Sequence, residues 1–372
     1  QNCWNFKRKY LILYLLILDL IDSYSFLNVF KYLTVRTGLA VFTSLLVVFL
    51  IGNPFINFFS TKQILSPIRE DGPDEHIIKK IGTPTMGGVL ILIGLFAGIL
   101  LWGDLTNIYI WFLIYIVGSY GILGAFDDYK KVKYKNSSGI SFKFKIISQI
   151  LLALLGVVIL TYLSENQDLE NLYFPFFKNL VINLGWFFIP FGIFIIVGSS
   201  NAVNLTDGLD GLATVPVILV AACFAFISYV TGNIVFSDYL QIPYIKGVGE
   251  VTVFLGAIIG SCLGFLWFNA PPAKIFMGDT GSLSLGGSLG AVGIITKHEI
   301  VLAITGGLFV LEAISVIVQV VSFKMTGKRI FKMAPIHHHY EKKGWPESTV
   351  VIRFWIVAII LAMVGLATLK FR

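Results

Sequence analysis

The stretch VTVFLGAIIGSCLGFLWFNAPPA (residues 251–273) decides the fold class of this chain, because it contains no charged side chain. A transmembrane helix needs about 20 mostly apolar residues to cross the hydrocarbon core of a bilayer, and this stretch is long enough. Backbone groups in lipid must form their hydrogen bonds within the segment, so such a stretch is predicted to be a helix. The stretch therefore predicts a membrane-spanning helix.

The same pattern recurs on both sides of this stretch. Eight more charge-free stretches approach or exceed the length of a span, and one further stretch is interrupted only by Glu312: 37–59, 81–103, 105–126, 146–164, 179–206, 211–237, 280–296, 354–369 and, with Glu312, 300–323. We therefore expect an all-α integral membrane protein with about ten transmembrane helices, which form one domain over residues 35–372.

Composition excludes the common soluble classes. Of the 372 residues, 56% are hydrophobic and 13% are charged, and the mean hydropathy is +0.83, more than a single soluble domain can bury. The net charge is +7, but the basic residues form short clusters between apolar runs, which argues against nucleic-acid binding. The three cysteines are too few and too scattered for a disulfide framework or a zinc site, so Cys223 and Cys262 are predicted to be packing residues.

Residues 1–34 are predicted to form a separate N-terminal segment. The apolar run YLILYLLIL (10–18) follows Lys7-Arg8-Lys9, as in a signal peptide, but no small-residue cleavage site comes after it. We therefore favour an interfacial helix that lies on the membrane.

The distribution of basic residues predicts the orientation. Loops 60–80, 127–145, 269–280 and 324–353 carry 18 Lys and Arg, whereas the opposite loops between helices carry Lys178, Lys246 and Lys297. The positive-inside rule makes the first set cytoplasmic, and ten spans then place both termini outside. The basic residues before residue 37 contradict this, and we give the internal loops more weight. Since almost every polar motif falls in the first set, we expect the active site on the cytoplasmic face.

Five aspartates on this predicted cytoplasmic face indicate the chemistry: Asp127 and Asp128 in GAFDDYKKVK, Asp207 and Asp210 in NAVNLTDGLDGLA, and Asp279 in FNAPPAKIFMGDTGS. We place Asp207 and Asp210 on a helix start, where a spacing of three residues gives them a common face. Carboxylates suit Mg²⁺, which typically binds one or two of them together with substrate phosphates. The alternative is that Asp207 and Asp279 simply cap the helices that follow them. Five aspartates on one membrane face favour the metal site.

Basic and glycine-rich segments accompany the aspartates. Lysines at 79–80 and within 130–135 could join a carboxylate-bound metal in a charge clamp of the kind that phosphoryl transfer requires. The glycines of 82–88 and 278–281 lie at helix entrances, where backbone N–H groups can face an anion. Other glycines, spaced four residues apart within 94–98, 256–264 and 286–290, are predicted to serve close helix packing.

Two further features involve titratable side chains. His337, His338 and His339 are adjacent, which is not a metal-ligand spacing on one helix face, but imidazole can donate to phosphate or exchange protons near neutral pH. Glu312 lies inside a predicted span, where an acidic residue is a functional candidate by default. We favour a structural hydrogen bond for it, since it lies two or more helical turns from the inner face.

Five motifs follow one another in the order PTMGG, DDYKK, NAVNLTDGLDGL, FMGDTGS and PIHHHYEKKGWPE. In this order across ten helices they closely resemble the phospho-N-acetylmuramoyl-pentapeptide transferases, a family of the polyprenyl-phosphate N-acetylhexosamine-1-phosphate transferase superfamily. The resemblance covers about residues 25–372. The triple histidine with YEKKGWPE favours this branch over the N-acetylglucosamine-phosphate branches.

The resemblance implies a reaction, a cofactor and a location. Phospho-N-acetylmuramoyl-pentapeptide would be transferred from UDP-N-acetylmuramoyl-pentapeptide to undecaprenyl phosphate, giving lipid I and UMP in the first membrane step of peptidoglycan synthesis. Mg²⁺ would be required. The chain would be a multi-pass protein of the bacterial cytoplasmic (inner) membrane in contact with membrane lipid, and a homodimer is one option for its assembly.

The resemblance also implies roles for single residues. The catalytic residues would be Asp127, Asp128, Asp279, His337 and His338, with Asp127 as the base that deprotonates the lipid phosphate. Asp279 would be the principal Mg²⁺ ligand, with Asp127, Asp128 and Asp207 as further candidates. The substrate-binding residues would be Lys80, Thr85, Lys131, Asn201, Asn204, Asp207, Gly208, Leu209, Asp210, Phe276 (stacked on uracil), Gly278 and Gln319. Direct attack by the lipid phosphate and a covalent aspartyl-phosphate intermediate both stay open.

Two other functions compete with this one. A sister transferase would use UDP-N-acetylglucosamine as its donor. A cation- or proton-coupled transporter would place acidic residues near the middle of the bilayer and would contain paired broken helices, whereas the aspartates here cluster at helix ends on one side.

Overall fold

The computed structural model describes residues 14, 17, 20, 24–62, 64, 82–134, 139–164, 166, 168–177 and 180–370. Most of the predicted interfacial helix over 10–18 and the predicted substrate residue Lys80 lie outside this part of the chain. The described elements are η1 (Ser25–Lys31), α2 (Leu33–Thr61), α4 (Gly87–Trp102), α5 (Ile108–Tyr134), α6 (Phe142–Leu163), β1 (Asn171–Tyr173), β2 (Val181–Asn183), η2 (Gly185–Phe187), α7 (Phe188–Thr206), α8 (Thr214–Thr231), α9 (Ile234–Leu240), η3 (Val248–Glu250), α10 (Val251–Asn269), α11 (Gly278–Thr296), α12 (Glu299–Thr305), α13 (Gly307–Thr326), α14 (Ile336–Glu341) and α15 (Glu347–Ala367).

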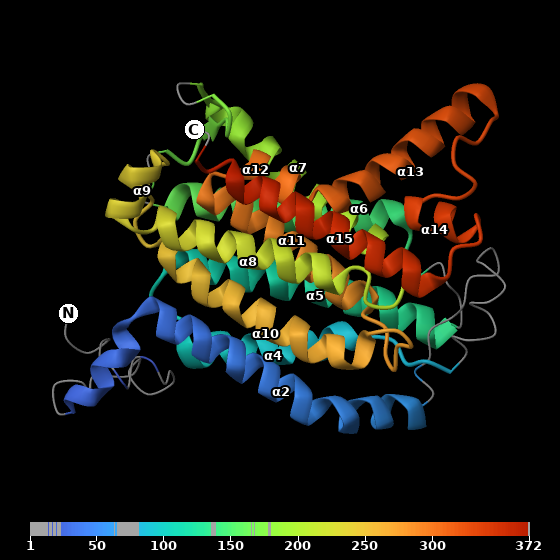
Figure 1. Cartoon of the computed structure of the whole chain (residues 1–372), viewed down its shortest axis with the longest axis horizontal. Helices are drawn as coiled ribbons and strands as arrows, with labels where there is room; N and C mark the ends of the chain where they lie inside the picture. The colour runs from blue at the N-terminus through green and yellow to red at the C-terminus, as the bar shows by residue number, and fades with distance from the viewer. Residues whose placement is uncertain are drawn as a thin grey trace.

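The chain folds into a layered bundle of long helices, apart from the small antiparallel pair β1–β2 (Figure 1). Within the described ranges, eight helices are long and apolar enough to cross a membrane: α2, α5, α6, α7, α8, α10, α13 and α15. The prediction of an all-α membrane protein is thereby confirmed at this level. α4 is apolar but has only 16 residues, and α11 is rich in glycine and serine.

Two predicted spans are divided in the structure. The stretch 300–323 forms α12 and α13, which meet at the glycine pair Gly306-Gly307, a common site of helix breaks. The stretch 211–237 forms α8 and the short α9, because the side chain of Asn233 accepts hydrogen bonds from the N–H groups of Val235 and Phe236 and starts a new helix. A single helix over either stretch was therefore a wrong prediction.

α11 is the central helix, and every residue from Asp279 to Thr296 is buried. Its serine hydroxyls donate to carbonyls of the preceding turn, so they need no partner outside the helix. Neighbouring helices approach closely at small residues: a Cβ added at Gly290 would lie 2.9 Å from the Ile195 carbonyl oxygen of α7.

The other spaced glycines also lie at helix contacts. A Cβ at Gly260 of α10 would lie 2.1 Å from the Val41 carbonyl oxygen of α2, and one at Gly94 of α4 would lie 2.4 Å from the Val48 side chain of α2. These glycines, with their neighbours at four-residue spacing, therefore serve packing as predicted. Cys223 and Cys262 are both buried, which confirms their prediction as packing residues.

The PTMGG segment serves to position the start of α11. The N–H groups of Gly87 and Gly88 donate to the carbonyl oxygens of Phe276 and Met277, both at 2.8 Å. Met86 enters α4 with a φ of 67°, and a Cβ on Gly88 would lie 2.0 Å from the Gly281 nitrogen. The N–H groups of these two glycines thus bond to carbonyl oxygens of the protein, and the prediction that they face an anion was wrong.

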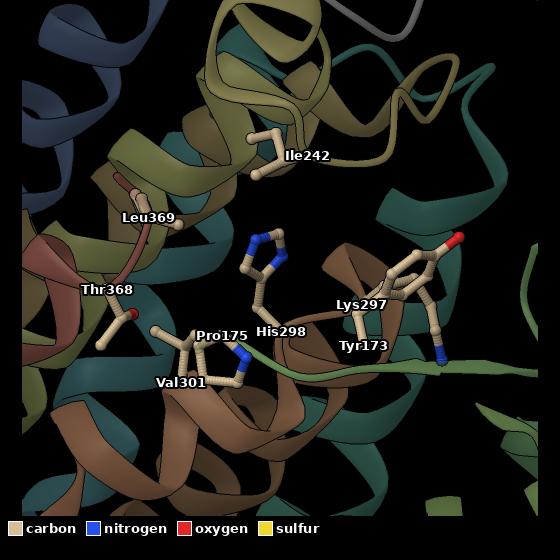
Figure 2. A pocket seen from close by; sticks show the side chains of 8 residues that line it. All are labelled: Tyr173, Pro175, Ile242, Lys297, His298, Val301, Thr368 and Leu369. Carbon is tan, nitrogen blue, oxygen red and sulfur yellow. The ribbon is translucent and has the colours of Figure 1, made fainter. Parts of the chain in front are cut away.

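A second polar region lies at the opposite end of α11, about 27 Å from Asp279 at 1.5 Å per residue. There Lys297 and Glu299 form a completely buried ion pair of 2.7 Å, and Lys297 also donates to the Leu169 carbonyl oxygen. Figure 2 shows the His298 imidazole pointing into an adjoining cavity of about 10 Å³, which is room for one water molecule. This cavity is too small for a substrate.

Candidate functional site

Three buried carboxylates from two helices form the centre of the site. Asp127 and Asp128 come from α5 and Asp279 from the first turn of α11, and one oxygen of each lies within 4.8 Å of the others. The close approach depends on Gly124, three residues before Asp127, where a Cβ would lie 2.3 Å from the Asp279 carbonyl oxygen. The structure thus brings together the three aspartates predicted to be catalytic.

The predicted span 105–126 ends just before Asp127 and Asp128, but in the structure both residues lie within α5. The helix continues to Tyr134 through a lysine-rich stretch, because lysine is a good helix former and its charge is favourable near a helix C-terminus. This extension places Lys131 one turn after Asp127, at the correct spacing for an ion pair.

Asp128 caps the N-terminus of α11. Its carboxylate accepts hydrogen bonds from the N–H groups of Asp279 and Thr280, both at 3.0 Å, and from the Thr280 hydroxyl at 2.7 Å. The N-terminal N–H groups of a helix otherwise lack partners, and a negative charge there is favourable. The N–H groups at the start of α11, which were expected to face an anion, therefore bind the Asp128 carboxylate. Asp279 itself lies inside the helix, so it is not the capping residue that the alternative interpretation required.

Asp127 and Asp279 share Lys131, and Asp279 also pairs with Lys145. Lys131 Nζ lies 2.6 Å from Asp127 Oδ2 and 3.1 Å from Asp279 Oδ1, and Lys145 Nζ lies 2.5 Å from Asp279 Oδ2. The other oxygen of Asp127 accepts from the Ile140 N–H at 2.6 Å. Asn204 donates to Asp279 Oδ1 at 2.9 Å. Three carboxylates thus face two ammonium groups in a largely buried setting.

Sequence reasoning missed several residues of this site. Lys145 was overlooked because it follows the aspartate pair by 17 residues, at the start of another apolar helix. Its basic neighbourhood in SFKFK was the available signal. Thr280 binds Asp128, and Ser282 accepts from Asn204 at 2.8 Å. Both lie in the motif FMGDTGS, in which only Phe276, Gly278 and Asp279 were assigned roles.

The aspartates of NLTDGLDG lie in a turn, so their prediction as part of a helix start was wrong. α7 ends at Thr206 with Asp207 as its C-cap, and α8 begins at Thr214, after Gly211 with a φ of 71°. Asp207 lies outside the three-carboxylate group. Asp210 Oδ2 accepts from the Ala273 N–H at 2.9 Å, and the Asp210 N–H donates to Glu347. Leu209 packs in a buried apolar cluster with residues of α13 and α15, so it supports the turn from inside.

The three histidines have three different environments. His337 is completely buried, with Nδ1 3.1 Å from Glu312 Oε1. His338 Nδ1 lies 2.6 Å from Glu341 Oε2. His339 Nδ1 accepts from the Lys332 N–H at 3.0 Å. Partial desolvation and the nearby charges of two lysines, at 343 and 332, lower the pKa of His339 below its ordinary value.

The remaining predicted substrate residues line this end of the bundle in various roles. Thr85 is buried, and its N–H donates to the Ile64 carbonyl oxygen. Gly278 has a φ of 73°, and a Cβ there would lie 2.7 Å from Asp128 Oδ2. Asn201 donates to Gln149 Oε1 and to its own helix, both at 2.8 Å. Phe276 pairs through its backbone with the PTMGG segment.

Gln319 organises the loop that follows α13. Its Oε1 accepts from the N–H groups of Ile330 and Phe331, and its Nε2 donates to the Phe331 carbonyl oxygen. Glu312 forms a side-chain contact with His337, which agrees with the structural hydrogen bond favoured for it.

The donor set of the three-carboxylate group fits a hard divalent cation. It offers carboxylate oxygens from rigid helix positions, and no nitrogen or sulfur ligand is part of the group in the described residues. A metal held there could share the site with phosphate oxygens, which Lys131 and Lys145 are placed to neutralise.

Comparison with known proteins identifies relatives along the whole chain. The model of glycosyl transferase family 4 matches residues 108–297, and that of phospho-N-acetylmuramoyl-pentapeptide-transferase signature 1 matches residues 80–92. The phospho-N-acetylmuramoyl-pentapeptide-transferase of Pelagibacter ubique (strain HTCC1062) is 81% identical over 361 residues, which cover 97% of this chain and 100% of the relative. The protein of the same name from Maricaulis maris (strain MCS10) is 53% identical over 367 residues, again 97% of this chain and 100% of the relative.

These matches agree with the resemblance seen in the five motifs, and they identify a bacterial multi-pass membrane enzyme. The chain belongs to the family of phospho-N-acetylmuramoyl-pentapeptide-transferases.

Proposed function

We propose that this chain transfers phospho-N-acetylmuramoyl-pentapeptide from its UDP carrier to undecaprenyl phosphate, forming lipid I and UMP in the first membrane step of peptidoglycan synthesis. Membership of the family supports this reaction over the cation-coupled transporter. The observation that carries the proposal is the buried group of Asp127, Asp128 and Asp279 between Lys131 and Lys145. Such a site can bind a metal and the phosphates of a donor together.

The proposed architecture completes the membrane domain with α4 and α11. Together with the eight longer helices they give ten spans, with both termini outside and the three-carboxylate group at the cytoplasmic face of the inner membrane. A lipid acceptor would reach this group from the bilayer, and a charged donor would reach it from the cytoplasm. Cysteine accessibility of exposed loop positions in intact and permeabilised cells tests this orientation.

In the proposed reaction an oxygen of undecaprenyl phosphate attacks the sugar-linked phosphorus of the donor. The bond from this phosphorus to the bridging oxygen breaks, and UMP leaves with that oxygen. Asp279, with Asp127 and Asp128, would hold Mg²⁺, which when bound would neutralise phosphate charge. Asp127 would accept the proton of a lipid phosphate that arrives protonated. Lys131 Nζ lies 2.6 Å from Asp127 Oδ2 and would keep this carboxylate oriented.

The lysines and the polar turn would position the two substrates. Lys131 and Lys145 would exchange their contacts with Asp279 for phosphate oxygens, and Asn204 would keep Asp279 oriented. The turn over 207–211 and Phe276 would recognise the nucleoside. His338, which is half-buried at the same end of the bundle, would approach the phosphate or sugar side of the donor.

The test is UMP release by the purified protein with undecaprenyl phosphate, UDP-N-acetylmuramoyl-pentapeptide and Mg²⁺, with and without EDTA. We expect release that depends on the metal and is lost in Asp279→Asn. Asp238→Asn, the same change at an exposed position of α9, is the control and should retain activity. Release only with UDP-N-acetylglucosamine would instead assign the sister reaction, and full turnover in Asp279→Asn would remove the metal role of this residue.

A further inference from the structure

A buried acid–imidazole pair lies outside the three-carboxylate group. Glu312 of α13 and His337 of α14 are both completely buried, and their side chains meet at 3.1 Å. In the described part of the chain, neither Glu312 Oε2 nor His337 Nε2 has a hydrogen-bond partner. Buried polar groups rarely stay in such a position without a function or a strong structural reason.

The imidazole lies against the turn that carries NLTDGLDG. A Cβ added at Gly208 would lie 2.4 Å from His337 Nε2, so the ring fills the space that a side chain would need. A Glu312 carboxylate can only accept the hydrogen bond from His337, so the ring must donate from Nδ1–H. A neutral His337 therefore carries its proton on Nδ1 and directs the Nε2 lone pair toward this turn. Glu312 therefore fixes both the orientation and the tautomer of the ring.

The same turn is held by neighbouring elements on other sides. Glu347 of α15 accepts from the Asp210 N–H at 3.0 Å, and Asp210 Oδ2 accepts from the Ala273 N–H at 2.9 Å. Trp355 Nε1 donates to the Gly211 carbonyl oxygen at 3.2 Å. Hydrogen bonds from neighbouring elements thus hold the turn in place, and His337 packs against it at Gly208.

α13 holds the histidine segment at two points on one face. Gln319 lies seven residues, or two turns, after Glu312, and it binds the backbone of Ile330 and Phe331. The two side chains therefore fix both the loop before α14 and the first turn of α14.

We propose that Glu312 is a positioning residue, which holds His337 against Gly208 and so keeps the turn over 207–211 in the shape that recognises the donor nucleotide. This inference rests on the proposed function. His337 acts through the turn, because complete burial keeps its ring from a donor that arrives from solvent. The pair therefore contributes to donor affinity more than to the chemical step.

Steady-state kinetics with Glu312→Leu and Glu312→Gln test this assignment. In Glu312→Leu the donor KM should rise about tenfold, the size expected for one lost buried hydrogen bond, while kcat falls less than about threefold. Glu312→Gln keeps an acceptor oxygen and should stay within about threefold of the wild type in both constants. A wild-type KM in Glu312→Leu, or a loss confined to kcat, would overturn the proposal.

A double-mutant cycle tests the contact at Gly208 and does not depend on the folding of Glu312→Leu. Gly208→Ala should raise the donor KM, because its methyl group meets the His337 ring. His337→Asn keeps a donor toward Glu312 but leaves that space open, so adding Gly208→Ala to it should have little further effect. If the effects of Gly208→Ala and His337→Asn on the donor KM multiply in the double variant, the two residues act independently, and their contact is not how His337 affects donor binding.

The matched control is Glu299→Leu, which makes the same change at another buried acid at the far end of α11. Its donor KM should equal that of the wild type, and a similar rise there would show a general effect of losing a buried charge and overturn the proposal. Turnover by the wild type distinguishes a failure of the proposed function from a failure of the role proposed for Glu312. No UMP release by the wild type contradicts the proposed function. Normal release with an unchanged KM in Glu312→Leu contradicts this inference alone.

Discussion

Replacing Asp128 by Asn should destabilise the protein, because this carboxylate is the N-terminal cap of the central helix. Asp128 accepts three hydrogen bonds, two of them from backbone N–H groups of α11. If the Asn oxygen stays with the two Thr280 donors, its NH₂ group faces the Asp279 N–H and leaves that buried donor without an acceptor. One unsatisfied buried donor and the lost charge at a helix N-terminus together cost about 2–4 kcal/mol.

Thermal unfolding of the purified protein in detergent, followed by tryptophan fluorescence, measures this loss. Asp128→Asn should lower Tm by several degrees, and Thr280→Val, which removes one hydroxyl bond, should cost about 1 kcal/mol. Asp127→Asn is the matched control, since it keeps an oxygen for the Ile140 N–H, and Lys131 keeps Asp279 as a partner. UMP release should be lost in both aspartate variants, so stability alone separates them. Equal melting temperatures for both and for the wild type would refute the capping argument.

Three further predictions concern single positions. Gly88→Ala should abolish stable folding or the alignment of α11, because the added Cβ would lie 2.0 Å from the Gly281 nitrogen; a normal yield and Tm would contradict this. Phe276→Ala should raise the donor KM more than it lowers kcat if the ring stacks on uracil, and the reverse pattern in steady-state kinetics would argue against stacking. The lowered pKa of His339 keeps its ring neutral at pH 7, with Nδ1 accepting from the Lys332 N–H. The stabilisation from this hydrogen bond should be present above about pH 6.5 and should be lost as the pH falls toward the pKa of His339 in the folded protein. Hydrogen–deuterium exchange of the Lys332 amide, corrected for its intrinsic rate, should therefore show less protection at acidic pH. Unchanged protection would contradict the direction of this pH dependence.

The sequence by itself determined the helical membrane class, because apolar length is a local property that any window of the chain displays. It also predicted a group of aspartates at one end of the bundle, since they stand in motifs that resemble a known family, and the structure places Asp127, Asp128 and Asp279 together. Spaced glycines also predicted close helix contacts, because a four-residue spacing is a local pattern that places the glycines on one face of a helix.

What each aspartate does was decided only by the tertiary structure. Asp127 and Asp128 are neighbours in sequence, yet one pairs with a lysine and the other caps α11, because successive helix residues point about 100° apart and meet different partners. Lys145 and Glu312 join the functional end of the bundle through contacts with Asp279 and His337 that span 134 and 25 residues. No local pattern contains such contacts, since they depend on how separate helices pack. The sequence therefore determined the helical membrane class and the kinds of side chain available at the site, and packing decided which groups meet.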